Sequence, residues 1–133
     1  MKKYINLLTI VLMTVAPVMA QINGSAKVKD MNGNTFNLLS AKADPAHADG
    51  LKGYLGGQTF TIKWANIKRI ILIKSRAPIK KGYSKAELEM INGEKHGFLI
   101  YTDFNLTGIK ESTKAKYSLK FSELTEILFS HHR

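Results

Sequence analysis

An internal repeat constrains the fold of this chain more than any other feature of its sequence. Residues 60–67 (FTIKWANI) return 57 positions later as residues 117–124 (YSLKFSEL). Residues 26–33 match residues 86–93 at an offset of 60, and residues 50–52 match residues 108–110 at an offset of 58. The sequence therefore predicts a duplicated unit, with one repeat at about 26–76 and the other at about 84–130.

The first segment of each repeat has the pattern of a β-hairpin. Apolar residues alternate with polar ones over residues 26–31 and 86–91, and each segment ends in Asn-Gly, a strong hairpin signal. A three-residue loop keeps the apolar positions on one face, because it pairs Val28 with Phe36 and Leu88 with His96. The sequence thus predicts a type I turn with a glycine bulge in both hairpins.

The spacing of apolar residues changes near the end of each repeat. It is two residues along the strands that begin at Phe60 and Tyr117, and three residues afterwards. A single helical turn or a bulge would place all of the following side chains on the core: Trp64, Ile67 and Ile70 in the first repeat, and Phe121, Leu124 and Ile127 in the second. No segment after residue 20 has an apolar stripe long enough to predict an α-helix.

These patterns predict an all-β protein of about 8–10 short antiparallel strands. Two architectures are open: one duplicated sandwich or barrel with a shared core, which we favour, and two tandem small barrels. A separate barrel of roughly 50 residues would bury a marginal core. In each repeat a strand ends in Asn-Gly, a second strand follows, and an apolar strand closes with a turn and isoleucine. This order is similar to that of small SH3-like and Sm-like barrels.

The two repeats differ in charge at one pair of positions. Lys27 and Lys29 in the first repeat are replaced by Glu87 and Glu89 in the second. If the two duplicated strands lie side by side, these charges can face one another, and each exposed pair contributes about 0.2–1 kcal/mol. We therefore expect pairing between the two repeats rather than within one repeat.

The N-terminus has the pattern of a cleaved signal helix. Lys2 and Lys3 precede the apolar residues 5–15, and Val18-Met19-Ala20 matches a cleavage site. The alternative is a retained anchor, but the apolar run is shorter than the roughly 18–20 residues that span a bilayer. We expect a signal peptide at residues 1–20, a single domain at residues 21–133 without a membrane span, and a periplasmic or secreted location in a bacterium.

Composition narrows the possible partners. The chain has no cysteine, which excludes disulfides and thiolate metal sites. It has 20 Lys+Arg against 10 Asp+Glu, and removal of Lys2 and Lys3 leaves a net charge of +8. Such a charge favours anionic partners in the envelope, namely polymers, lipid headgroups or acidic proteins, or it serves solubility alone. Nucleic acid is not an expected partner of an exported chain.

A run of basic residues is the first candidate site. Within it no acidic residue occurs, and the second repeat has Thr125 and Glu126 where the run begins, so the fold does not require its charge. We expect a docking surface for an anionic partner, and the alternative is a solvated linker. The run consists of Lys68, Arg69, Lys74, Arg76, Lys80, Lys81 and Lys85.

His96 is the second candidate, because it takes the core-facing place that Phe36 has in the first repeat. A buried imidazole usually serves as a hydrogen-bonded core residue, and the alternative is a ligand contact in a cavity between the repeats. No catalytic, metal-binding or phosphate-loop motif occurs, so we expect no enzyme activity, cofactor or metal. The leading hypothesis is an exported binding or structural module with a basic surface, and the alternative is a carrier of a small ligand.

Overall fold

The computed structural model describes residues 24–74 and 80–131 as an all-β fold. The predicted signal peptide and Arg76 lie outside these residues. Within them there is no α-helix, and none long and apolar enough to cross a membrane. The strands are β1 (Gly24–Asp30), β2 (Thr35–Ala43), β3 (Leu51–Leu55), β4 (Gln58–Ile62), β5 (Ile67–Ile73), β6 (Tyr83–Met90), β7 (Lys95–Tyr101), β8 (Asn105–Lys110), β9 (Ala115–Lys120) and β10 (Leu124–His131). The predicted all-β class is confirmed.

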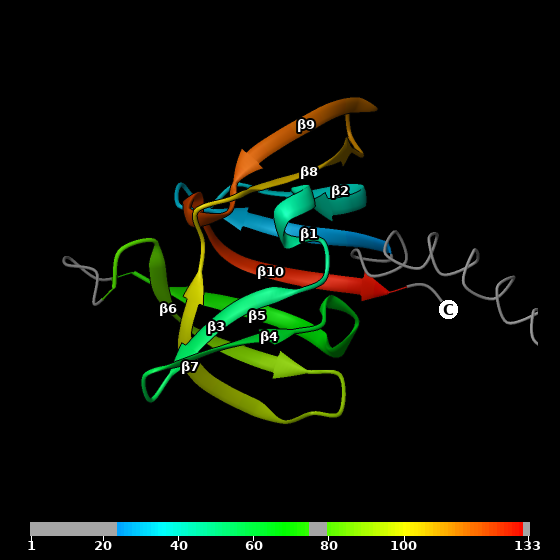
Figure 1. Ribbon diagram of the computed structural model, residues 1–133. Helices are drawn as coiled ribbons and strands as arrows, with labels where there is room; N and C mark the ends of the chain where they lie inside the picture. Colours follow the sequence, from blue (N-terminus) through cyan, green and yellow to red (C-terminus); the bar gives the residue numbers. More distant parts are fainter. Residues whose placement is uncertain (1–23, 75–79, 132–133) are drawn as a thin grey trace, which may run out of the picture.

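All ten strands belong to one antiparallel sheet with the order β4-β3-β7-β6-β5-β10-β1-β2-β8-β9. We call β4-β3-β7-β6-β5 the β5 half and β10-β1-β2-β8-β9 the β10 half; they form the lower and upper parts of Figure 1. Strands β1–β5 come from the first sequence repeat and β6–β10 from the second. Each half therefore takes three strands from one repeat and a hairpin from the other, so that the repeats exchange their first hairpins.

The two Asn-Gly hairpins have the predicted register. Val28 pairs with Phe36 in the first hairpin, and Leu88 pairs with His96 in the second. Both glycines have a positive φ, 87° at Gly33 and 93° at Gly93, a conformation that favours glycine because a Cβ atom would crowd the backbone. The predicted three-residue loops with a glycine bulge are confirmed.

A single turn of 3₁₀ helix follows each of the strands β4 and β9, at Trp64–Asn66 and Phe121–Glu123; a third turn, Pro45–His47, follows β2. The predicted change of spacing is confirmed, since all six of these side chains have 0% exposure: Trp64, Ile67, Ile70, Phe121, Leu124 and Ile127.

Trp64 joins the two repeats at the core. Its ring centroid lies 6.2 Å from that of Phe104, 6.4 Å from Phe121 and 5.9 Å from Phe129, all in the second repeat. Its indole Nε1 donates a hydrogen bond of 2.9 Å to the His47 carbonyl oxygen. One cluster of buried side chains thus draws on both repeats.

The predicted contact between the strands that carry Lys27 and Lys29 and those that carry Glu87 and Glu89 is wrong. These strands are β1 and β6, and β5 and β10 lie between them. The charges were expected to face one another because the duplicated strands were placed side by side. The exchange instead brings β1 beside β10 and β6 beside β5.

The charges of these strands still favour pairing between repeats. Arg69 on β5 lies opposite Glu89, and Lys29 lies opposite Glu126 on β10. The Nε atom of Arg69 is 3.8 Å from Glu89 Oε1 and 3.7 Å from Glu126 Oε2. If each repeat closed on itself, Arg69 would face Lys29 and Glu126 would face Glu89. Like charges opposite one another are unfavourable, so these four residues favour the exchanged arrangement.

Candidate functional site

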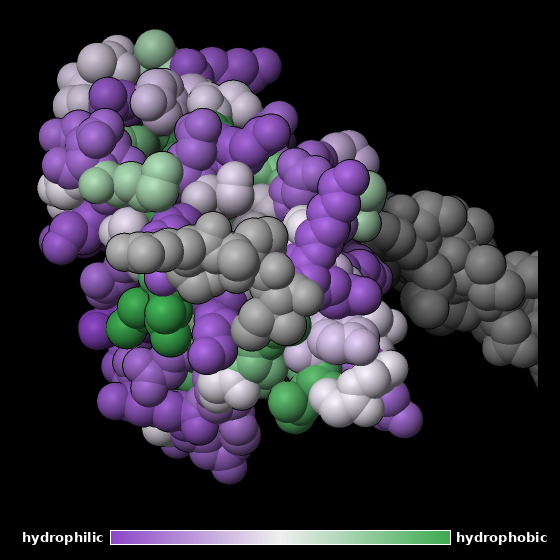
Figure 2. All heavy atoms as spheres, turned by 90° about the vertical axis from the view of Figure 1, so that its left-hand side faces the viewer, coloured by the Kyte–Doolittle hydropathy of each residue, from purple (hydrophilic) through white to green (hydrophobic). Residues whose placement is uncertain are grey.

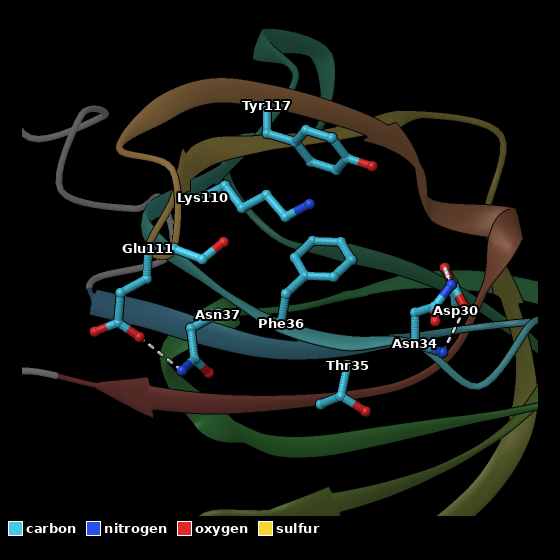
Figure 3. A pocket seen from close by; sticks show the side chains of 9 residues that line it. Asp30, Asn34, Thr35, Phe36, Asn37, Lys110, Glu111 and Tyr117 are labelled. Carbon is cyan, nitrogen blue, oxygen red and sulfur yellow. Dashed lines mark hydrogen bonds between the residues drawn. The ribbon is translucent and has the colours of Figure 1, made fainter.

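A pocket of about 520 Å³ lies at one end of the β10 half. Strand β2 and the turn before it form one side, and β8, the β8–β9 turn and β9 form the other (Figure 3). The pocket thus lies between segments of the two repeats. The side chains that matter for its chemistry are Asp30, Phe36, Asn37, Lys110, Glu111 and Tyr117.

The ammonium group of Lys110 lies beside a pair of aromatic rings. Its Nζ is 4.9 Å from the ring centroids of both Phe36 and Tyr117, and these rings meet edge to face with centroids 5.2 Å apart. Figure 3 shows the lysine side chain next to both rings. The rings attract the cation through their quadrupoles, which holds the charge at a fixed place in the pocket.

The carboxylates of the pocket already have hydrogen-bond partners. Asp30 Oδ1 accepts hydrogen bonds of 2.9 Å from the backbone N–H groups of Asn32 and Asn34. Glu111 Oε1 accepts one of 2.8 Å from Asn37 Nδ2. Among the described residues, no carboxylate lies within 4.0 Å of the Lys110 ammonium. Lys110 is therefore the charged group of the pocket that is free to bind a ligand.

The equivalent place in the β5 half is filled by aromatic rings. Phe60 replaces Tyr117 there, and its ring packs edge to face on Phe98 with centroids 5.0 Å apart. Gly53 is the equivalent of Gly108 in the strand register, and a Cβ atom at Gly53 would lie 2.7 Å from the Phe60 ring. The exposed His96 replaces the pocket residue Phe36 in this half, so the repeat does not by itself require a pocket.

The pocket lysine has no lysine equivalent in the β5 half. In the strand register Leu55 replaces Lys110, because Leu55 pairs with Gln58 as Lys110 pairs with Ala115. Lys52, elsewhere on the same strand, is engaged: its Nζ donates a hydrogen bond of 3.1 Å to Thr61 Oγ1 and lies 3.6 Å from Asp49 Oδ1. The repeat therefore does not require the pocket lysine.

His96 does not face the core, and this part of the prediction is wrong. Its backbone has the predicted register, but its side chain is 50% exposed, and Nε2 lies 3.2 Å from Glu94 Oε1. Residues 95–97 of β7 are all exposed, because this end of the strand extends past the buried part of the sheet. His96 lines neither the pocket described above nor two other surface hollows of the described residues, one on the β5 half and one over β1, β5 and β10.

The first two residues of the basic run lie against carboxylates. Lys68 Nζ is 3.7 Å from Glu89 Oε2, and Arg69 lies between Glu89 and Glu126 as described above. Lys74 donates a hydrogen bond to the Ser122 carbonyl oxygen, and partial burial lowers the pKa of its ammonium below the ordinary value. These three residues therefore have partners within the protein.

The last three residues of the run lie elsewhere. Lys80 Nζ is 4.5 Å from the ring centroid of Tyr54 and 5.6 Å from that of Tyr83. Lys81 and Lys85 are exposed, and Lys85 lines an apolar groove on the β5 half. The structure thus separates the described part of the run into three residues held by carboxylates or a carbonyl oxygen and three residues on the surface of the β5 half.

Searches against protein-family models, curated proteins and solved structures found no match. In the described part of the chain, no three His, Asp or Glu side chains are grouped as a metal site. Sequence reasoning missed Lys110, Tyr117 and the role of Phe36 as pocket residues. A signal was available in the repeat itself, since His96 replaces Phe36 and Phe60 replaces Tyr117 between the two copies.

Proposed function

We propose that the protein is an exported, non-enzymatic binding module of the bacterial envelope that holds an anionic ligand in the pocket lined by Phe36, Lys110 and Tyr117. The observation that carries this proposal is the Lys110 ammonium, which lies beside two rings without a carboxylate within 4.0 Å in the described residues. An anionic group can bind this ammonium while an aromatic or apolar body lies against the rings.

The neighbouring acids narrow the class of ligand. Asp30 and Glu111 line the same pocket, and their charges repel anionic groups that approach them. A ligand with one compact anionic group near Lys110 fits better than one with several. This proposal combines the two functions considered from the sequence: an anionic partner, and a small ligand bound between segments of the two repeats.

We also propose that the two halves of the sheet are copies of one small barrel whose first hairpins have been exchanged. Two features support this. The strand order outward from the centre of the sheet is the same in both halves when equivalent strands are compared, and a 3₁₀ turn precedes β5 in one half and β10 in the other. The pocket then lies at the open end of the second copy.

Replacing Lys110 by glutamine is expected to weaken the binding of an arylsulfonate such as benzenesulfonate about tenfold, because a charged hydrogen-bond donor is lost. Calorimetric or fluorescence titration of the wild-type protein and the variant, at low and high salt, measures this effect. Binding by the wild-type protein should also weaken as salt increases.

Lys52→Gln is the control, because it removes a lysine on the other half of the sheet, outside the pocket. It should leave arylsulfonate binding unchanged, and the neutral benzenesulfonamide should bind both lysine variants and the wild-type protein alike. Equal losses in K110Q and K52Q, or unchanged affinity in K110Q, would refute the pocket as the anion site.

The proposed signal peptide can be tested separately from the pocket. The chain expressed with its own N-terminus in a bacterium should be found in the periplasmic or extracellular fraction, with a mature N-terminus at Gln21. N-terminal sequencing of the fractionated protein measures this. A protein that keeps Met1 and stays in the cytoplasmic fraction would contradict the signal peptide.

A further inference from the structure

A second surface feature lies on the β5 half, away from the Lys110 pocket. It is a shallow groove of about 390 Å³. In the sheet register, Tyr54, Leu99, Lys85 and Ile73 form one row across β3, β7, β6 and β5. Neighbours along a strand point to opposite faces. The row therefore lies on the face opposite to the buried Ala86.

Large aliphatic side chains are exposed at this groove. Leu55 has 60% exposure and Ile73 has 48%, and both line the groove together with Leu99. Gly97 lies on the same face and contributes no side chain, which leaves the hollow. On the side of the molecule seen in Figure 2, strongly hydrophobic side chains reach the surface among hydrophilic ones.

Lysines and tyrosines surround these aliphatic side chains. Lys85 lines the groove, and Lys80 lies over the ring of Tyr54, whose centroid is 6.0 Å from that of Tyr83. Lys81, the next residue, is exposed. The nearest acid in the register is Glu87, opposite Gly97. The groove itself has no acidic side chain in its lining.

The repeat shows that the fold does not require this apolar surface. In the strand register, Lys85 and Ile73 correspond to the small polar residues Ser25 and Ser130 of the β10 half, and Leu55 corresponds to Lys110. Tyr54 and Leu99 keep aliphatic equivalents, Ile109 and Leu39. A large exposed apolar side chain without a structural reason commonly marks an interaction site.

We infer that this surface docks on an anionic lipid bilayer. Leu55 and Ile73 enter the boundary between headgroups and acyl chains, the lysines contact lipid phosphates, and the tyrosines lie at the level of the headgroups. A lipid surface fits because it presents an apolar layer directly beneath a continuous layer of negative charge. The inference does not depend on the Lys110 pocket, since the two surfaces share no residue.

The chain has no cysteine, so a single introduced cysteine can report on this surface alone. Leu55→Cys carries a polarity-sensitive fluorophore, and Thr113→Cys, at an exposed position in the β8–β9 turn of the β10 half, is the control. The probes are vesicles of phosphatidylcholine with phosphatidylglycerol and vesicles of phosphatidylcholine alone. We expect a blue shift and protection from an aqueous quencher only for the label at position 55 and only with phosphatidylglycerol. This readout is local, so lipid binding by the N-terminal segment does not produce it.

Lysine variants test the headgroup contacts. In the labelled Leu55→Cys protein, Lys80→Ser and Lys85→Ser should each weaken vesicle binding about fivefold at low salt, whereas Lys95→Ser, at an exposed position outside the groove, should not. Equal signals at positions 55 and 113, or an equal shift with phosphatidylcholine alone, would overturn the inference. A shift at position 55 that grows with protein concentration without vesicles would also overturn it, because it would identify a contact between two copies of the chain.

Discussion

Expressed as two separate chains, one ending at Lys74 and one beginning at Lys80, the protein is expected to fold only when the two pieces are mixed. Each half of the sheet takes strands from both pieces, and the rings around Trp64 come from both. A piece of this size would bury too little apolar surface to be stable alone. Circular dichroism and the dispersion of NMR signals, recorded for each piece and for an equimolar mixture, measure the effect.

The charges on the central strands predict which pieces associate. In the mixture Arg69 faces Glu89 and Lys29 faces Glu126, whereas two copies of the first piece would place Arg69 opposite Lys29. The mixture should therefore form a heterodimer in preference to either homodimer. Two results would contradict the claim that the exchanged arrangement is the more stable one. The first piece could fold alone as a stable monomer, or it could form a homodimer in preference to the heterodimer.

Replacing Trp64 by alanine is expected to lower the free energy of unfolding by about 3–5 kcal/mol. The side chain has 0% exposure, and its removal leaves a cavity beside the phenylalanines that join the repeats. It also removes the hydrogen bond to the His47 carbonyl oxygen. Urea unfolding followed by circular dichroism measures the change.

Trp64→Phe is the control, because phenylalanine occupies the equivalent place at Phe121. This variant keeps an aromatic ring in the core and loses the indole hydrogen bond, so we expect a cost of about 1–2 kcal/mol. A loss of less than about 1 kcal/mol in the free energy of unfolding of Trp64→Ala would show that the site collapses without leaving a cavity. It would also show that the contacts of Trp64 with the second repeat contribute little to stability.

Local features of the fold could be predicted because each depends on residues close together in the sequence. The position of Asn32-Gly33 relative to Val28 and Phe36 allows only one loop length that keeps apolar side chains on one face. The change of spacing after Trp64 is equally local, because a 3₁₀ turn advances the chain by three residues per turn. Register and turn type follow from such patterns without any knowledge of the rest of the sheet.

The exchange of hairpins could not be predicted from hydrophobic pattern. The repeats have the same apolar positions, so a hairpin of one repeat fits the core equally well beside either repeat. The charges at Lys29, Arg69, Glu89 and Glu126 distinguish the two arrangements, and each exposed contact contributes only about 0.2–1 kcal/mol. The reversal of charge between the repeats indicated that strands of the two repeats lie side by side, which they do. The contact was expected between β1 and β6, whereas β1 lies beside β10 and β6 lies beside β5.

The candidate site was the least predictable part. Alternation indicates which face of a strand a residue occupies but not how far the core extends along that face, so His96 was placed inside although it is exposed. The pocket depends on which strands lie beside β2. Phe36 meets Lys110 and Tyr117 only because the exchange brings β8 and β9 of the second repeat next to β2.

An NMR titration of the isotope-labelled protein with benzenesulfonate tests the anion pocket most directly. We expect saturable shifts of the ring signals of Phe36 and Tyr117 and of the Lys110 ammonium and side-chain signals, with those of Phe60, Phe98 and Lys52 unchanged. Phe60, Phe98 and Lys52 lie in the other half, outside the pocket, so a general effect of the probe on aromatic or lysine side chains would move both groups. Shifts confined to Phe60 and Phe98, or spread equally over both groups, would contradict the binding of an anion at Lys110.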